Sequence, residues 1–162
     1  NDHEIGALAH FAVQNNIVMR MIEFMPLDSG RAWQREHVVP GSEILERVQA
    51  EISVAPLPPQ HPAETASRWS LGDGQAELGI IAPVTQPFCG QCNRIRLTAD
   101  GHIRTCLFSV HEHDLKPSLR DDSGDDELVA ELQRIVWKKE PGHQIGQPGF
   151  VQPERSMSGI GG

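Results

Sequence analysis

Apolar residues recur every three or four positions in three stretches of the chain, which predicts three amphipathic helices. These stretches are residues 5–16, residues 41–52 and residues 125–139. In the third stretch the predicted apolar stripe consists of Leu128, Val129, Leu132, Ile135 and Val136, and Trp137 extends it. One apolar stripe per helix is typical of helices that pack on a sheet, so we expect a layered arrangement.

Between the first two helices, residues 17–25 form a short and mostly apolar run bounded by Asn16 and Pro26. The run predicts a strand that is buried on both faces, as in a sheet built from alternating helices and strands. Arg20 and Glu23 interrupt it on opposite faces. A charge in a buried strand is costly, so each of these side chains is expected to have a partner or to face a polar cavity.

Two hairpins are predicted further along the chain. The first lies within residues 69–83 and turns at residues 72–74, and the second lies within residues 94–108 and turns at residues 99–101. Both turns contain aspartate followed by glycine, a pair that favours tight reversals between strands. We expect the two hairpins to form one small antiparallel sheet.

The remaining stretches show no strong period. Residues 27–41 and the alanine- and proline-rich residues 55–66 are interpreted as loops. The last 20 residues contain five glycines and two prolines, a composition that favours a disordered tail. Ile160 is the apolar residue near the terminus that would anchor the tail if it is ordered.

Composition limits the classes of function. The chain has 162 residues and a formal net charge of -8 at pH 7, and this acidic excess argues against a protein that binds nucleic acid or a membrane surface. No apolar run approaches the ~20 residues of a membrane span, and no charged and then apolar signal segment opens the chain. We therefore expect a cytoplasmic protein without a nucleic-acid or membrane partner.

The three cysteines have the spacing Cys89-x2-Cys92-x13-Cys106. A C-x2-C pair places two thiolates on one metal across a tight turn, and the second hairpin returns the third cysteine towards them. Three cysteines suit a [4Fe-4S] cluster with one open iron, whereas a structural zinc site needs a fourth ligand. The spacing alone favours neither. In the zinc alternative, a Cys3His interaction module, the fourth ligand is His102, His111 or His113.

Arg94 and Arg96 follow the cysteine pair and lie two positions apart on a predicted strand. Their guanidinium groups are therefore expected on one face beside the metal, where each can hold anionic oxygens by forked hydrogen bonds. This pair favours the cluster with an open iron over zinc. The alternative interpretation of the arginines is a solvated basic strand. A ferredoxin-like electron carrier fits less well, because it normally has four cysteine ligands per cluster.

The run Phe-Cys-x2-Cys-Asn-Arg-x-Arg-Leu-Thr-x-Asp-Gly-x4-Cys-Leu-Phe at residues 88–108 resembles the C-terminal signature of the MoaA family, the GTP 3',8-cyclases of molybdenum cofactor biosynthesis. The similarity continues from Asn-Asp-x-Glu at residues 1–4, through Arg-x2-Glu-Phe-Met-Pro at residues 20–26, to the final Gly-Gly. Family members carry a C-x3-C-x2-C motif in an N-terminal half. This chain contains no such motif, so it resembles only the C-terminal half and is expected to be inactive alone.

The resemblance implies a lyase of the radical S-adenosylmethionine class that converts GTP to 3',8-cyclo-7,8-dihydro-GTP. A first [4Fe-4S] cluster, in the absent N-terminal half, cleaves S-adenosylmethionine; the resulting radical takes a ribose hydrogen from GTP, and the sugar radical attacks C8 of guanine. Cys89, Cys92 and Cys106 would bind the second [4Fe-4S] cluster, whose open iron binds the guanine.

The resemblance also implies roles for other residues. The GTP-binding residues would be Arg20, Arg94, Ile95 through its backbone, and Arg96. Met25 would contact S-adenosylmethionine, and the catalytic set would be Arg94, Arg96, Gly161 and Gly162, with the two glycines reaching the active site. The residues alone are equally consistent with a structural ion pair for Arg20, and for Met25 they favour a place in the core.

The fold implied lies between α/β and α+β. Residues 1–40 would be the terminal helix and strand of an incomplete (β/α) barrel, residues 41–150 a cluster- and GTP-binding domain with a small antiparallel sheet, and residues 151–162 a flexible tail. The expected partners are GTP, S-adenosylmethionine, a second copy in a homodimer, and the next molybdopterin-pathway enzyme, which receives the product.

Overall fold

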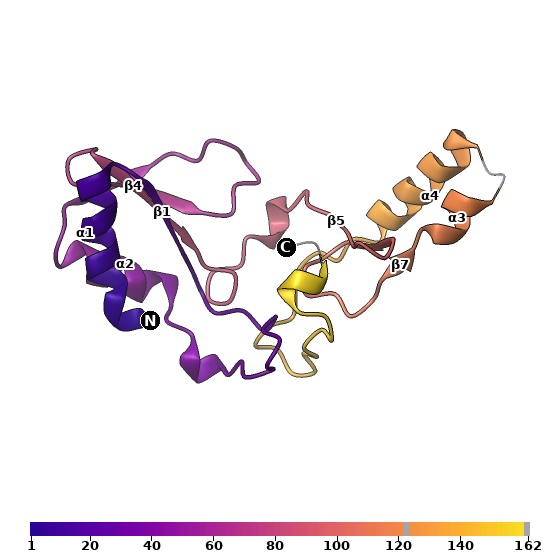
Figure 1. The fold of residues 1–162 in the computed structure, drawn as a ribbon, viewed down its shortest axis with the longest axis horizontal. Coiled ribbons are helices and arrows are strands. Elements are labelled where there is room, and N and C mark those ends of the chain that lie inside the picture. The colour runs from indigo at the N-terminus through magenta and orange to yellow at the C-terminus, as the bar shows by residue number, and fades with distance from the viewer. Residues whose placement is uncertain (122–123, 161–162) are drawn as a thin grey trace. The chain divides into compact units, whose positions relative to one another are not determined.

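The computed structural model describes residues 1–121 and 124–160. The chain divides into two compact units (Figure 1). The first comprises Asn1–Met25 and Gln34–Gln91, and the second comprises Pro26–Trp33 and Cys92–Gly162. The expected mixture of α/β and α+β structure is confirmed, since the described residues form a four-stranded mixed sheet and a three-stranded antiparallel sheet. Neither sheet closes into a barrel within these residues.

The first unit contains the four-stranded sheet, in the order β1-β4-β3-β2. Its strands are β1 (Val18–Ile22), β2 (Val54–Leu57), β3 (Ser67–Leu71) and β4 (Ala76–Ile81). β1 pairs with β4 in parallel, and the other two pairings are antiparallel. The helices are α1 (Ile5–Asn15) and α2 (Gly41–Gln49), with three short 3-10 helices, η1 (Asp2–Glu4), η2 (Arg35–His37) and η3 (Cys89–Gln91).

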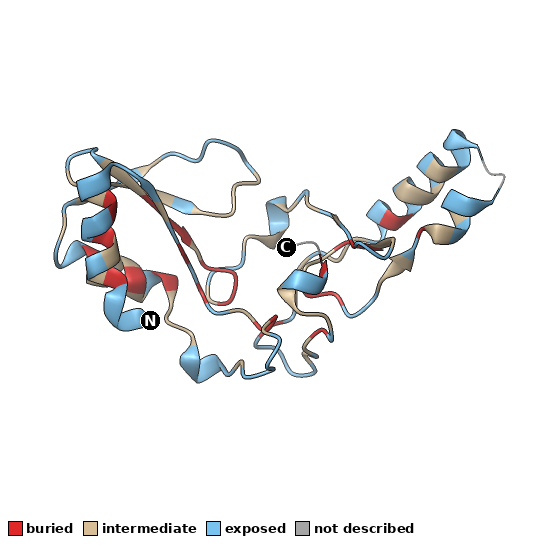
Figure 2. Ribbon diagram, in the orientation of Figure 1, coloured by how far each residue is buried: buried red, intermediate tan, exposed pale blue. Residues whose placement is uncertain are grey.

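Both predicted helices of this unit are confirmed, and they cover one face of the sheet (Figure 1). α1 ends close to the predicted boundary at residue 16, and Asn16 adopts the left-handed conformation with φ of 49°. The buried core beneath the helices consists of Ile5, Ala9, Ala12, Met21, Ile44, Val48, Leu71, Leu78, Ile80 and Ala82. Figure 2 shows this core in red on the inner sides of the helices and the sheet.

The other face of the sheet differs from the expectation. Residues 17–25 were predicted to be buried on both faces, but Val18 is 58% exposed and Ile22 is 51% exposed. β1 lies at the edge of the sheet, and the two helices cover only the face that carries Met21. The prediction was wrong for the opposite face, because an apolar composition alone does not say which elements cover a strand.

The predicted hairpin within residues 69–83 is confirmed as β3 and β4. We expected this hairpin to join the later hairpin in one sheet, and that prediction was wrong. β3 and β4 instead pair with β2 and β1. β2 overlaps residues 55–66, a stretch that we expected to be a loop because it is rich in alanine and proline. A proline is compatible with a strand at the edge of a sheet, which is where β2 lies.

The second unit contains the sheet β5-β6-β7, with helices packed on it. Its elements are β5 (Arg96–Leu97), β6 (His102–Arg104), β7 (His113–Asp114), α3 (Lys116–Arg120), α4 (Asp125–Trp137) and η4 (Met157–Ile160). The second predicted hairpin is therefore confirmed with shorter strands, and β7 was not predicted because a two-residue strand has no visible period.

The third predicted helix is confirmed as α4, but its buried face is narrower than expected. Leu128, Leu132 and Ile135 pack on Ile103 and Leu115. The other residues of the predicted stripe are exposed: Val129 is 50%, Val136 44% and Trp137 88% exposed. The inward side chains follow spacings of four and three residues, which keeps them on one line of the helix, whereas the exposed ones are rotated away from that line.

The segment before the C-terminus makes more contacts than its composition suggested. The Met157 N–H donates to the Leu27 carbonyl at 3.1 Å, and Arg155 forms ion pairs that are described below. Ile160 is fully buried, which agrees with its expected role as an anchor. The predicted site residues Gly161 and Gly162 lie outside the described residues.

None of the helices in the described part of the chain combines the length and the apolar character that a membrane crossing requires.

Candidate functional site

The three cysteines are distributed over both units. Cys89 begins η3 near the end of the first unit, and Cys92 and Cys106 belong to the second. All three are half-buried thiols outside any disulfide. Within residues 1–121 and 124–160, no three His, Cys, Asp or Glu side chains are gathered as the ligands of a metal ion. The cluster on these cysteines, and equally the zinc alternative with a histidine, therefore stays a prediction.

Lys139 braces the backbone next to Cys92 and Cys106. Its ammonium donates to the Arg94 carbonyl at 2.9 Å and also to the Thr105 carbonyl. Arg94 precedes β5 and Thr105 follows β6, so the ammonium links the two segments just outside the paired residues of these strands. Sequence reasoning assigned Lys139 only to the end of a helix, because its two backbone partners are distant in the sequence.

The thiol of Cys92 lies in an environment that favours the thiolate. Burial raises the pKa of this thiol, but the Arg94 backbone N–H and the positive charges of Lys139 and Arg94 outweigh burial, so its pKa lies below the usual value. Thiolates, not thiols, are the ligands of iron and zinc. The donor set of three reduced, half-buried cysteines therefore fits a metal-thiolate centre in its chemistry.

The predicted pair Arg94 and Arg96 lies at the start of the hairpin. Arg96 belongs to β5 and faces Arg104 across the ladder, and Arg94 precedes the strand. Both side chains are half-buried, and Ile95 between them is 46% exposed. Because Arg94 lies before β5, the expected placement of the two guanidinium groups on one face stays a prediction.

Arg104 is a buried cation that sequence reasoning missed. Its side chain is 2% exposed and forms an ion pair with Glu112 at 3.0 Å, and it also donates to the Ser109 carbonyl. These contacts fold the segment after Cys106 back onto β6. A charged residue directly after Ile103 in a predicted strand was the available signal, since a buried arginine requires acceptors nearby.

A second set of polar contacts surrounds the residues next to Cys106. The Thr105 hydroxyl donates to Glu140 Oε2 at 2.7 Å. Burial raises the pKa of Glu140, but hydrogen bonds from Thr105 and Ser109 outweigh it, so that this pKa is lowered and the carboxylate form is favoured. Cys106 is thus flanked by backbone that is fixed through side-chain contacts on both sides.

The turn of the hairpin is closed by its own side chains. The Thr98 hydroxyl donates to Asp100 Oδ1 at 2.5 Å and accepts the His102 N–H at 2.9 Å, and Gly101 has φ of 82°, which favours glycine. Arg155 forms a forked contact with Asp100 at 2.7 and 3.2 Å. Hydrogen bonds from Arg155 and then Thr98 lower the pKa of Asp100 well below its usual range.

In the first unit, Glu23 is a buried carboxylate with a full set of donors. It accepts the backbone N–H groups of Gly41, Val84 and Thr85 at 2.8, 2.8 and 2.9 Å, and the Thr85 hydroxyl at 2.5 Å. The expectation that this charge has partners is confirmed. Glu23 therefore links the segment after β1 to the start of α2 and to the segment after β4.

Arg20 and Met25 also belong to the first unit. Arg20 lies on the sheet face away from the helices and forms an ion pair with Glu77 at 2.9 Å, so the structural contact that the sequence left open is present. Met25 is half-buried at the end of the first segment of the unit. The predicted binding roles of both residues stay predictions.

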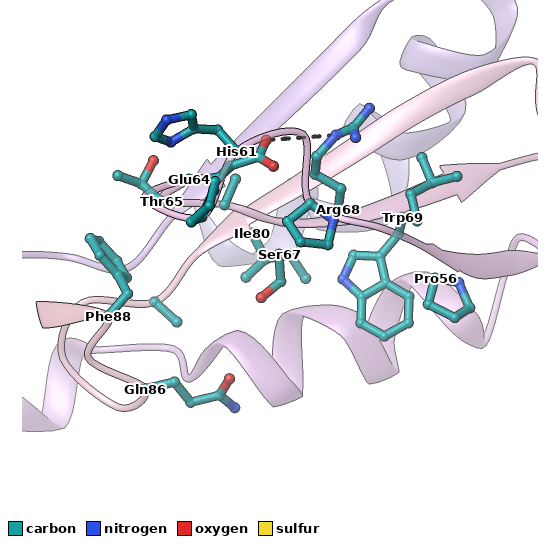
Figure 3. A pocket seen from close by; sticks show the side chains of 15 residues that line it. Pro56, His61, Glu64, Thr65, Ser67, Arg68, Trp69, Ile80, Gln86 and Phe88 are labelled. Atoms are coloured by element: carbon teal, nitrogen blue, oxygen red, sulfur yellow. Dashed lines mark ion pairs between the residues drawn. The ribbon is translucent and has the colours of Figure 1, made fainter. Parts of the chain in front are cut away.

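A cavity of about 330 Å³ lies beside β3 in the same unit (Figure 3). Its apolar wall includes Trp69, Ile80 and Phe88, and the ion pair of Glu64 with Arg68 lies at its rim. No residue singled out from the sequence as a ligand lines it.

Comparison with known proteins identifies the family context. Residues 17–145 match the family described as Molybdenum Cofactor Synthesis C. This match covers most of the described elements, from β1 to the residues that follow α4.

Individual relatives are similar over the whole of this chain. A GTP 3',8-cyclase from Corynebacterium glutamicum is 42% identical, and the match covers 100% of this chain and 44% of that protein. Proteins with the same name from Streptomyces coelicolor and Rhodopirellula baltica are each 41% identical, with 100% of this chain and 48% and 46% of those proteins covered. The chain thus spans about half the length of the relatives that it matches.

Proposed function

The chain belongs to the Molybdenum Cofactor Synthesis C family, and from this premise we propose that it is the C-terminal part of a GTP 3',8-cyclase. The observation that carries the proposal is the match of the entire chain, at 41–42% identity, to proteins of that name. The activity, conversion of GTP to 3',8-cyclo-7,8-dihydro-GTP by radical chemistry with S-adenosylmethionine, is proposed for the complete enzyme.

In this proposal Cys89, Cys92 and Cys106 hold a [4Fe-4S] cluster. The lowered pKa of Cys92 supports thiolate ligation, and the braced backbone next to Cys106 supports a fixed ligand position. When bound, the cluster would supply an open iron for coordination of the guanine of GTP. The chain's own contribution is to keep three thiolates available and to place the cationic groups of Lys139 and Arg94 near Cys92.

Arg94 and Arg96 are proposed to bind the anionic oxygens of GTP, with the backbone at Ile95 as a further contact. Both residues are half-buried, and water screens the interactions of a partly buried charge less than those of an exposed one, so these cations stabilise negative charge on the ligand more strongly. Arg20 is proposed as a third GTP-binding residue, since its side chain is partly exposed on the open face of the first sheet.

Met25, Gly161 and Gly162 complete the proposed site. Met25 would contact S-adenosylmethionine, and the glycine pair would reach the reacting groups, because residues without side chains fit a passage that excludes any Cβ. Cytoplasmic location, a homodimer and transfer of the product to the next pathway enzyme remain part of the proposal.

The exposed apolar residues of β1 support a further element of the proposal, the incomplete (β/α) barrel. Val18 and Ile22 lie on the uncovered face of an edge strand, and large apolar side chains in such a position favour a neighbour that buries them. We propose that the helix and strand of residues 1–40 continue such a barrel, that residues 41–150 bind the cluster and GTP, and that the tail serves the active site.

Metal analysis after anaerobic purification tests the cluster. We expect roughly four iron and four sulfide per chain in the reconstituted protein, and a large loss of both when Cys89, Cys92 or Cys106 is replaced by alanine, since two thiolates do not retain a cubane. Leu97→Ala, at an exposed position on the same hairpin, is the matched control and should keep its iron. Zinc in place of iron and sulfide would support the Cys3His interaction module instead.

A further inference from the structure

Charged side chains form a row across three strands on the open face of the first sheet. β1, β4 and β3 contribute Arg20, Glu77 and Arg68. Glu77 Oε1 lies 2.9 Å from Arg20 Nη2, and Arg68 donates to both oxygens of the same carboxylate at 3.1 and 2.5 Å. A single carboxylate therefore holds two guanidinium groups next to each other.

The far end of the row is fixed to the segment between β2 and β3. The Arg68 side chain is only 10% exposed, and its Nη1 donates to the Pro58 carbonyl at 2.9 Å. Glu64 Oε1 lies 3.7 Å from Arg68 Nε. Figure 3 marks this ion pair with a dashed line. With acceptors on several sides, Arg68 serves as an anchor for Glu77.

Gly79 makes room for the near end of the row. It lies opposite Arg20 on one side of β4 and opposite Arg68 on the other. A Cβ at this position would lie 2.5 Å from Cδ and 2.8 Å from Cζ of Arg20, which is closer than real contacts allow. The side chain of Arg20 thus crosses Gly79, which has no side chain, to reach Glu77. Any larger residue at position 79 would displace the side chain of Arg20.

The guanidinium group of Arg20 has two protein contacts, and its side chain is partly exposed to solvent. Its Nη1 donates to the Met19 carbonyl at 3.3 Å and its Nη2 contacts Glu77, yet the side chain is 37% exposed. A guanidinium has five N–H donors, so two contacts leave capacity for the oxygens of an anionic ligand. With Glu64 included, the row carries no net charge, so an anionic ligand would be held by the partly exposed N–H donors of Arg20 and not by an excess of positive charge.

We propose that Glu77, anchored by Arg68, is a positioning residue that fixes Arg20 in the orientation in which it binds the anionic oxygens of a nucleoside triphosphate. The inference rests on the proposed function, since it takes GTP as the ligand of Arg20. Hydrogen bonds from Arg68 lower the pKa of Glu77 against the opposing effect of burial, and Arg20 lowers it further, so the carboxylate remains charged at neutral pH.

The test is GTP binding by calorimetry to the complete enzyme that carries this chain. Glu77→Gln keeps the shape of the side chain and removes its charge, and we expect GTP affinity to fall roughly tenfold, the scale of one charge-assisted hydrogen bond. Arg20→Ala should weaken binding at least as much. In the Arg20→Ala background, Glu77→Gln should have no further effect, because Glu77 acts only through Arg20.

Gly79→Ala is a second and independent variant, since it displaces Arg20 without altering any charge. It should weaken GTP binding in the parent enzyme and not in the Arg20→Ala background. Glu43→Gln is the matched control: it removes an equivalent ion pair, that of Glu43 with Arg47 on α2, on the other side of the sheet. GTP affinity should be unchanged in this control.

The outcomes separate the inference from the proposed function. If Arg20→Ala binds GTP normally, Arg20 is not a ligand of GTP and that part of the proposed function fails. If Arg20→Ala is weakened but Glu77→Gln and Gly79→Ala bind normally, the positioning role is overturned and the role of Arg20 stands. Additive losses in the double variant would also overturn it, because they would show that Glu77 acts independently of Arg20.

Discussion

Glu23 shows how a single residue can organise a unit through the backbone. Its carboxylate is 2% exposed and accepts four hydrogen bonds from Gly41, Val84 and Thr85. The three residues belong to segments that lie 18 to 62 positions away in the sequence. A buried carboxylate is stabilising only when donors surround it, and here three of the four donors are main-chain N–H groups, while the fourth is the Thr85 hydroxyl.

We therefore expect Glu23→Gln to destabilise the first unit by about 2–4 kcal/mol, because the new amide group presents N–H donors to backbone N–H groups that need an acceptor. Chemical denaturation followed by circular dichroism measures the change. Glu46→Gln, on the exposed side of α2, is the matched control and should lie within about 0.5 kcal/mol of the parent. A loss for Glu23→Gln as small as that of the control would show that the four bonds contribute little.

Arg94 and Arg96 are the residues whose role depends most on the fork of the guanidinium group. In the complete enzyme, we expect Arg94→Ala or Arg96→Ala to lower turnover of GTP by at least ~100-fold, the scale of losing a preorganised charge donor. Lysine at either position should restore only part of the loss, since an ammonium is a point charge without the planar fork.

Iron content separates this role from a structural one. Both arginines precede or begin β5, so a general disturbance of the hairpin would release iron together with activity. We expect the arginine variants to retain their iron. Near-normal turnover in both alanine variants would instead identify a solvated basic strand.

At the scale of elements, the hairpin of β5 and β6 is joined to the C-terminal segment by ion pairs. Arg155 contacts Asp100 in the turn and also lies 2.9 Å from Glu112. The Met157 N–H donates to the carbonyl of Leu27, which fixes the same segment from another direction. Arg155 therefore couples the order of the terminal segment to the turn of the hairpin.

The pH dependence of this contact follows from the sign of the pKa shift. Arg155 and then Thr98 lower the pKa of Asp100 in the folded chain, so the contact contributes above the unfolded pKa of about 3.9 and is lost as the pH falls through the lower folded value. We expect limited proteolysis after residue 150 to become faster in the parent chain at acid pH. Asp100→Asn should show faster cleavage already at pH 7 and a weaker dependence on pH.

Asp73→Asn, at the exposed turn between β3 and β4, is the control for this experiment. It should leave the cleavage rate of the terminal segment unchanged. Equal rates for Asp100→Asn and the parent at pH 7 would mean that the other contacts of the segment, including that of Glu112, hold it without Asp100.

At the scale of the whole molecule, local signals in the sequence predicted the elements better than their pairing. The periodic stretches became α1, α2 and α4, and the aspartate–glycine turns became two hairpins. Pairing failed where it depended on distance: β1 lies parallel to β4, although nearly 60 residues separate Val18 from Glu77, and no local pattern encodes such a partner. The uncovered face of β1 and the buried Arg104 likewise depend on surroundings that a one-dimensional pattern does not contain.

The candidate site shows the same division. The cysteine spacing and the arginine pair are visible as residues in the sequence, and the resemblance to the family is carried by them. Lys139, Glu140 and Glu77 each contact a proposed site residue or its neighbour, but the partner lies 35 to 57 positions away in the sequence. Such contacts appear only once the chain is folded, because a single lysine or glutamate has no distinctive motif.

Ile160 is fully buried and Arg155 holds the preceding segment, so the terminal residues continue from an anchored point. Gly161 and Gly162 follow Ile160 directly in the sequence. If these glycines act in the site, their contribution therefore depends on the anchor as much as on their lack of a side chain.

Deleting Gly161 and Gly162 in the complete enzyme should lower turnover at least ~10-fold without changing the melting temperature or the iron content, since no buried side chain is removed. Replacing both by alanine should have a similar effect if the passage excludes a Cβ. Glu154→Ala, at an exposed position of the same segment, is the control that should retain activity. Normal turnover after the deletion would show that neither glycine belongs to the active site.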